Sequence, residues 1–132
     1  VETGLARGIE RLLPGLAGRI QAHHLRIPTV NVSTMTFCVR LKTVTGDQAE
    51  TVNRLFREHA ATDLAGILGH TDEPQASCDF NHDPRSVIVD GGCTDATGGL
   101  LHVLAWFDNE WGFANRMLDV ALAWPMGDTE HG

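Results

Sequence analysis

Residues 106–116 read Trp-Phe-Asp-Asn-Glu-Trp-Gly-Phe-Ala-Asn-Arg, and this stretch carries the strongest structural signal in the chain. It joins an apolar strand predicted at 100–107 to a helix predicted at about 110–123, through a short polar turn. Asn109 therefore lies at a strand end, where α/β proteins often hold ligands. An Asn or Asp there is most often a helix cap, and Asp108 competes for that role. The alternative is that the Asn109 amide, which is both donor and acceptor, binds a carboxamide of a ligand.

Apolar spacing and turn residues predict the other elements in the same way. A helix that Thr3 can cap ends at Pro14-Gly15, and a helix at about 48–61 is capped by Asp47. Alternation and short apolar runs predict strands at about 24–42, 64–69, 76–80 and 86–89. Gly91-Gly92 and Gly98-Gly99 bracket a loop or hairpin tip. These elements together predict an α+β domain with a mixed, mostly antiparallel sheet and helices on one face.

Composition limits the class of protein. A length of 132 residues allows one domain with a real core, and the net charge of −7 argues against nucleic acid as a partner. No apolar run is long enough to cross a bilayer, so no membrane partner is expected. Three cysteines without CxxC spacing indicate reduced thiols in a cytosol. The charge is uneven: residues 1–44 hold six Arg or Lys against two Glu, which suits either a small anionic ligand or a solvated face.

Two features of the first third could bind an anion. Thr3-Gly4 at a helix start offers a hydroxyl and free backbone N–H groups, although a plain N-cap explains the pair as well. Arg26 falls in a strand suited to burial, and a buried arginine needs a partner. That partner is either a carboxylate in a structural ion pair or a ligand phosphate.

The histidines and cysteines offer little further chemistry. The seven histidines show no metal-binding spacing, so no metal site is expected, and His59 on a helix stripe is interpreted as a core or interface residue. No cysteine has a base at predictable proximity. Cys38 and Cys78 are expected in strands as small apolar side chains. The tryptophans and phenylalanines near the C-terminus are interpreted as core or subunit contacts.

Three blocks resemble the phosphorylating glyceraldehyde-3-phosphate dehydrogenase superfamily, in the order of its C-terminal half. They are residues 26–33, 77–81 and 106–116, within a likeness that runs from Val1 to about Ala123. Residues 81–84, 86–91 and 109–119 are more similar to the erythrose-4-phosphate dehydrogenase branch; at Phe113, glyceraldehyde-3-phosphate dehydrogenases commonly have tyrosine. The resemblance implies the α+β fold predicted above from periodicity.

The resemblance also implies an activity for the parent enzyme. In this family Thr3, Gly4 and Arg26 match residues that bind substrate phosphate, and Asn109 matches the residue that holds the nicotinamide amide of NAD. The parent would oxidise D-erythrose 4-phosphate to 4-phosphoerythronate, toward pyridoxal phosphate, as a cytoplasmic homotetramer. The alternatives are a glycolytic glyceraldehyde-3-phosphate dehydrogenase or a non-catalytic assembly domain.

The chain also departs from the family pattern. The catalytic Ser-Cys-Thr-Thr-Asn segment, its activating histidine and the Gly-rich NAD-binding domain do not occur in residues 1–132, so no catalytic residue is assigned here. A start at Val1 fits an excised or truncated product. We therefore expect a C-terminal catalytic-domain fragment that is inactive alone and has an unpaired sheet edge.

Overall fold

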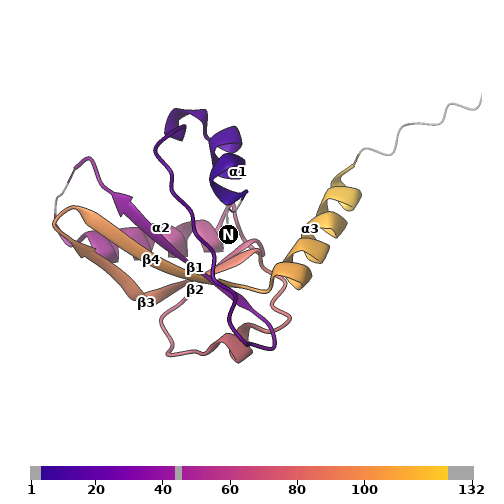
Figure 1. Cartoon of the computed structure of the whole chain (residues 1–132). Coiled ribbons are helices and arrows are strands. Elements are labelled where there is room, and N and C mark those ends of the chain that lie inside the picture. The colour runs from indigo at the N-terminus through magenta and orange to yellow at the C-terminus, as the bar shows by residue number, and fades with distance from the viewer. Residues whose placement is uncertain (1–3, 44–45, 125–132) are drawn as a thin grey trace, which may run out of the picture. The chain divides into compact units, whose positions relative to one another are not determined.

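The computed structural model describes residues 4–43 and 46–124, and the chain divides into two compact units, 1–30 and 31–132. The first unit contains helix α1 (Leu5–Leu12) and the 3-10 helix η1 (Pro14–Leu16). The second unit contains the sheet and all the other elements (Figure 1). These are β1 (Ser33–Arg40), α2 (Gln48–Ala61), β2 (Leu68–Thr71), η2 (Ser77–Phe80), β3 (Val87–Thr97), β4 (Leu100–Phe107) and α3 (Asn109–Ala123).

The sheet has the strand order β1-β4-β3-β2. The β1–β4 and β3–β4 pairs are antiparallel, whereas β2 and β3 run parallel. A turn at Gly98 and Gly99, both with positive φ, closes the β3–β4 hairpin. The predicted α+β class with a mixed, mostly antiparallel sheet is confirmed. Strand β1 has one partner, β4, so it forms an edge of the described sheet.

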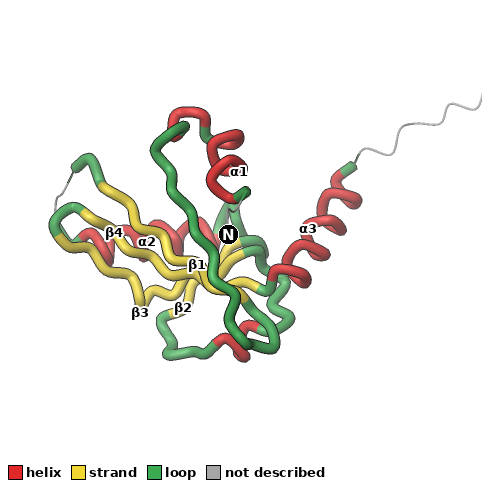
Figure 2. Tube along the Cα trace, in the orientation of Figure 1, coloured by secondary structure: helices red, strands yellow, loops and turns green. Residues whose placement is uncertain are grey.

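The long strand predicted at 24–42 is wrong over about its first half, residues 24–32. Regular pairing begins only at Ser33, and Figure 2 draws the preceding segment as loop. Pro28 has no N–H to donate, and Thr29 N–H bonds back to the Ile27 carbonyl at 2.9 Å, which curls the chain. Val32 then takes a left-handed conformation with φ of 70°, which is incompatible with a strand, so extended backbone begins only after it.

Helix α2 covers one face of the sheet and agrees with its predicted bounds. Asp47 caps it by accepting the Glu50 N–H at 3.1 Å. Its inner side chains Val52, Phe56 and Ala60 pack on a buried cluster from the strands. That cluster comprises Leu68, Val89, Leu101 and Val103. The interpretation of His59 as a core residue is wrong, because its exposed side chain turns away from this cluster to bond Asp63 at 2.7 Å.

The segment between β2 and β3 folds differently from the prediction. The strand expected at 64–69 begins only at Leu68, and the strand expected at 76–80 is the 3-10 helix η2. Strand β3 continues through Gly91-Gly92, which were expected in a loop, with a change of register between Asp90 and Asp95. Short apolar runs do not distinguish a strand from a helical turn, which accounts for these errors.

Helix α3 starts where β4 ends and extends beyond the sheet (Figure 1). Its apolar residues were expected to pack in a core or on another subunit. Within residues 109–123 only Gly112 is buried, while Trp111 and Phe113 are 44% and 65% exposed. The core role is therefore wrong for these two aromatic residues. None of the helices in the described ranges is long and apolar enough to cross a bilayer.

A buried histidine beside α2 makes stability depend on pH. The His70 side chain is 4% exposed, its Nδ1 lies 3.8 Å from Asp72 Oδ2, and its Nε2 has no partner in the described part of the chain. Burial lowers the pKa of His70 below its usual 6.5 and outweighs the opposing effect of Asp72; Arg57 also lowers this pKa, whereas Glu50 and Asp90 raise it. The unfolded chain therefore binds more protons below about pH 6.5.

We expect the free energy of unfolding to fall as the pH drops from 7.5 to 5.5, and to fall less in His70→Gln. Urea unfolding of the protein at both pH values measures this difference. His59 provides a control of opposite sign. Its hydrogen bond to Asp63 raises its pKa, so its contribution is present at low pH and is lost as the pH rises. His59→Gln should therefore steepen the loss in acid, and an unchanged pH dependence in His70→Gln would contradict the prediction.

Candidate functional site

The Asp108 carboxylate is the centre of the best-defined polar site. Asp108 is 2% exposed and caps helix α3, its Oδ1 accepting the Trp111 N–H at 3.0 Å. Its Oδ2 accepts the His82 N–H at 2.9 Å and the Asn31 side-chain amide at 2.8 Å. Burial by itself raises the pKa of Asp108, but the N–H donors outweigh it and hold the pKa below its usual range. Asp108 is therefore an ionised structural anchor at neutral pH.

This carboxylate joins three segments that are far apart in the sequence. The Asn31 amide also donates to Asn81 Oδ1 at 2.6 Å, which ties the chain before β1 to the loop after η2. His82, held with φ of 62°, places its ring 4.7 Å from the ring of Trp111 on α3. Asp108 and these contacts bring together the three blocks that carry the family resemblance. Sequence reasoning did not select Asn31, His82 or Asp108 as site residues, although the turn residues at 81–84 and the Asp cap were visible signals.

Aromatic and ionic contacts fix the loop behind this anchor. Phe80 stacks on Trp106 with ring centroids 5.4 Å apart, in a second cluster with Val32 and Ile88. Asp83 accepts the Arg85 backbone N–H and Nε–H, both at 2.9 Å. The hydrogen bonds from the Arg85 side chain keep the pKa of Asp83 low. Phe80 thereby ties the start of the loop to the sheet, and the Asp83–Arg85 bonds brace the loop internally.

Gly112 allows α3 to approach this loop closely. A Cβ at position 112 would lie 2.9 Å from the backbone carbonyl oxygen of Arg85, closer than such atoms pack in proteins. The absence of a side chain therefore allows the start of α3 to lie close to the loop that precedes strand β3. This contact positions Asn109, which is one turn earlier in the same helix.

Asn109 is the first residue of α3, and its side chain is exposed. The sequence left open whether Asp108 or Asn109 caps α3, and the structure shows that Asp108 is the cap. No hydrogen bond within the described residues engages the Asn109 amide, which leaves both its donor and its acceptor available. These properties fit an amide that orients the carboxamide of a ligand.

The proposed phosphate-binding residues lie in the other unit. Gly4 is exposed at the start of α1, whereas Thr3 lies outside the described residues. Arg26 is exposed in a loop, so the expectation of a buried arginine in a strand is wrong. No ion pair or hydrogen bond within 4–43 and 46–124 occupies its guanidinium. The convergence of Thr3, Arg26 and Asn109 on one ligand stays a prediction.

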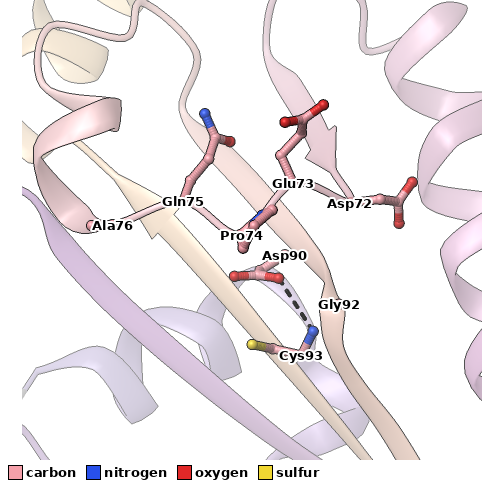
Figure 3. A pocket seen from close by; sticks show the side chains of 8 residues that line it. All are labelled: Asp72, Glu73, Pro74, Gln75, Ala76, Asp90, Gly92 and Cys93. Atoms are coloured by element: carbon pink, nitrogen blue, oxygen red, sulfur yellow. Dashed lines mark hydrogen bonds between the residues drawn. The ribbon is translucent and has the colours of Figure 1, made fainter.

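A shallow pocket of about 410 Å³ lies elsewhere in the second unit (Figure 3). Residues 72–76, Asp90, Gly92 and Cys93 line it. The carboxylates of Asp72, Glu73 and Asp90 make it acidic, and Asp90 Oδ2 accepts the Trp106 indole N–H at 3.1 Å. Such a lining repels a phosphorylated sugar. In the same described ranges, no three His, Cys, Asp or Glu side chains are grouped closely enough to hold a metal ion.

The sequence of the chain matches a known protein family. Residues 1–109 match the family described as glyceraldehyde 3-phosphate dehydrogenase, C-terminal domain. The match ends at Asn109, the first residue of α3. It includes all of the blocks 26–33 and 77–81 and the start of the block 106–116. It covers most of the 132 residues. The chain belongs to the family of glyceraldehyde 3-phosphate dehydrogenase C-terminal domains.

Proposed function

We propose that this chain supplies the phosphate- and nicotinamide-contacting residues of an NAD-dependent dehydrogenase that oxidises D-erythrose 4-phosphate to 4-phosphoerythronate. The observation that carries the proposal is the free Asn109 amide at the start of α3, beside a capping Asp108. The family match supports a dehydrogenase as the parent enzyme. The two anion-binding candidates of the first unit support a phosphorylated substrate.

The Asn109 amide is suited to hold NAD in one orientation. Its oxygen accepts from the carboxamide nitrogen of the nicotinamide, and its nitrogen donates to the carboxamide oxygen. Bound NAD supplies the hydride acceptor for aldehyde oxidation. The role of Asn109 is to bind and orient, and the nucleophilic cysteine comes from the segment that precedes this domain in the family.

Gly4 and Arg26 are suited to bind the substrate phosphate with Thr3. Backbone N–H groups at the start of α1 favour an anion, and the exposed Arg26 guanidinium can form two parallel hydrogen bonds with phosphate oxygens. The Arg26 guanidinium forms no ion pair within the described residues, which supports its proposed role in binding phosphate.

Asn109→Ala tests the cofactor role in the full-length enzyme. Loss of two neutral hydrogen bonds, about 1–3 kcal/mol, should raise the KM for NAD about tenfold and leave the KM for sugar phosphate nearly unchanged. Asn115→Ala is the matched control, because that amide already bonds the Trp111 carbonyl within α3. An unchanged KM for NAD in Asn109→Ala would remove the cofactor role.

The choice of substrate is tested by steady-state assays of the full-length enzyme. We expect a higher kcat/KM with erythrose 4-phosphate than with glyceraldehyde 3-phosphate, and activity without inorganic phosphate, because water releases the acid in this branch. Preference for the triose with a strict need for phosphate would assign the chain to the glycolytic enzyme instead.

A non-catalytic assembly role is the second candidate, and the exposure of α3 favours it. Apolar side chains on several sides of α3 are exposed, including Phe113, Met117, Leu118 and Leu122. Exposed apolar surface of this kind often marks a subunit contact. Sedimentation of the full-length protein at several concentrations would test the proposed homotetramer, and a tetramer that lacks dehydrogenase activity would favour assembly alone.

A further inference from the structure

The first turn of α3 carries Asn109, the residue proposed to hold the nicotinamide. The Asn109 amide has no hydrogen bond within the described residues, so the backbone of this turn sets its direction. Gly112 is the one buried residue of α3, and the turn therefore has no core of its own to hold it. Its position depends on the loop of residues 81–86, which lies against it.

The loop of residues 81–86 contacts the first turn of α3 at three points. A Cβ at Gly112 would lie 2.9 Å from the Arg85 carbonyl oxygen, so backbone meets backbone there. The His82 N–H donates to Asp108 Oδ2 at 2.9 Å. The His82 ring lies against the Trp111 ring, with centroids 4.7 Å apart and planes inclined by 41°. Backbone atoms of the loop make the first two contacts, whereas a side chain makes the third, so a substitution can remove the third alone.

The backbone of His82 is strained, and its ring fills no core. The φ angle of His82 is 62°, in the left-handed region that is disfavoured for residues other than glycine. The residue is exposed, so burial of the imidazole does not offset this cost. Strain of this kind persists where the surrounding structure holds it, and it clusters at binding sites. From this conformation the imidazole reaches Trp111, which is on the same helical turn as Asn109.

The next turn of α3 is held by a separate set of contacts. Arg116 Nη1 donates to the Gly66 carbonyl at 3.2 Å and to Ser86 Oγ at 3.4 Å. These bonds restrain the helix from its second turn onward and leave the tilt of the first turn free. The contact between the His82 and Trp111 rings removes that freedom.

We propose that His82 is a positioning residue for Asn109. Its ring, laid against Trp111, sets the tilt of the first turn of α3 and thereby the direction in which the Asn109 amide faces the nicotinamide carboxamide. This inference rests on the proposed function of Asn109. His82 itself makes no contact with NAD or with substrate in this role. The role needs no solvent access, because both rings belong to the same chain and contact each other directly.

His82→Asn in the full-length enzyme tests this role. Asparagine tolerates a left-handed backbone, so the N–H bond to Asp108 is kept and the ring is lost. We expect the KM for NAD to rise about fivefold and the KM for sugar phosphate to change less than about twofold, because one misdirected amide weakens both of its hydrogen bonds. Trp111→Leu removes the same ring contact and should act similarly, whereas Trp111→Phe keeps a ring and should stay within about twofold of wild type.

A double-mutant cycle separates positioning from a general structural role. In an Asn109→Ala background there is no amide to direct, so His82→Asn should cause no further rise in the KM for NAD. The same rise in both backgrounds would overturn the inference, because a structural role does not depend on the Asn109 amide. His59→Asn is the matched control, at an exposed histidine of α2 that bonds Asp63, and should leave both constants unchanged.

Asn109→Ala alone distinguishes the two possible failures. If it raises the KM for NAD and His82→Asn does not, the positioning role is wrong and the proposed function stands. If Asn109→Ala has no effect, the cofactor role fails and this inference fails with it. Urea unfolding shows whether His82→Asn keeps the loop in place. If the unfolding midpoint falls as far as in Asp108→Ala, the N–H bond has also been lost, and the comparison of Trp111→Leu with Trp111→Phe decides the outcome.

Discussion

Asp108→Ala should destabilise the protein by about 3–5 kcal/mol, because it removes a helix cap and two further hydrogen bonds to a buried carboxylate. The capping bond to the Trp111 N–H is lost, and so are the bonds from the His82 N–H and the Asn31 amide. Urea unfolding followed by circular dichroism measures the shift. We expect the loop around His82 to become more sensitive to protease as well, since Asp108 is its link to α3.

Two further variants show whether the geometry of Asp108 causes the effect. Asp108→Asn keeps one side-chain oxygen that can accept the capping hydrogen bond. Its NH2 group takes the place of the second oxygen and faces the donors of His82 and Asn31. The loss of stability should therefore be smaller than in Asp108→Ala, about 2 kcal/mol. Asp119→Ala removes an exposed carboxylate from the same helix, where it pairs with Arg116, and should cost less than about 1 kcal/mol. Equal losses in Asp108→Ala and Asp119→Ala would show that Asp108 is not the anchor.

Arg26→Ala in the full-length enzyme should raise the KM for the phosphorylated aldehyde about 10–150-fold. A charge-assisted hydrogen bond contributes about 1.5–3 kcal/mol, and each 1.4 kcal/mol is a factor of ten. The KM for NAD should change by less than about twofold, since the guanidinium is proposed to contact phosphate only. Steady-state kinetics with each substrate varied in turn measures both constants.

The exposure of Arg26 makes this a clean experiment, because no ion pair within the described residues is broken by the substitution. Arg26→Lys keeps the charge but loses the planar fork, so an intermediate KM is expected. Arg19→Ala, at another exposed arginine of the same unit, should leave both constants unchanged. A parallel rise in both constants for Arg26→Ala would indicate a structural role.

Local patterns predicted the elements that contain their own stop and start signals. The bounds of α2, the strand at 100–107 and the turn at Gly98-Gly99 follow from a cap, a run of apolar residues and a glycine pair. The segments whose predicted structure is wrong lack such signals. The run at 76–80 is equally suited to a strand or a helical turn, and its packing of Phe80 on Trp106 decides for η2.

At the candidate site, too, the sequence predicted some features and left others to the tertiary contacts. The sequence identified Asn109 and left open whether it or Asp108 caps α3, because both residues suit that position. The contacts of Asp108 with Asn31 and His82 decide the matter, and those partners lie 77 and 26 residues away. The sequence also indicated no base near any cysteine, yet the register of β1 against β4 brings Cys38 Sγ to 3.7 Å from His102 Nε2. No local pattern encodes that register.

By itself, the sequence of this protein determined its α+β class, its family resemblance, the bounds of its α-helices to within a few residues and those of strand β4. These properties depend on residue periodicity and on neighbours a few positions apart. Only the tertiary structure decided that Asp108 joins three distant segments, that Asn109 is left free and that Arg26 is exposed. The physical reason is that burial and hydrogen-bond partners are set by segments distant along the chain, which meet only when the sheet forms.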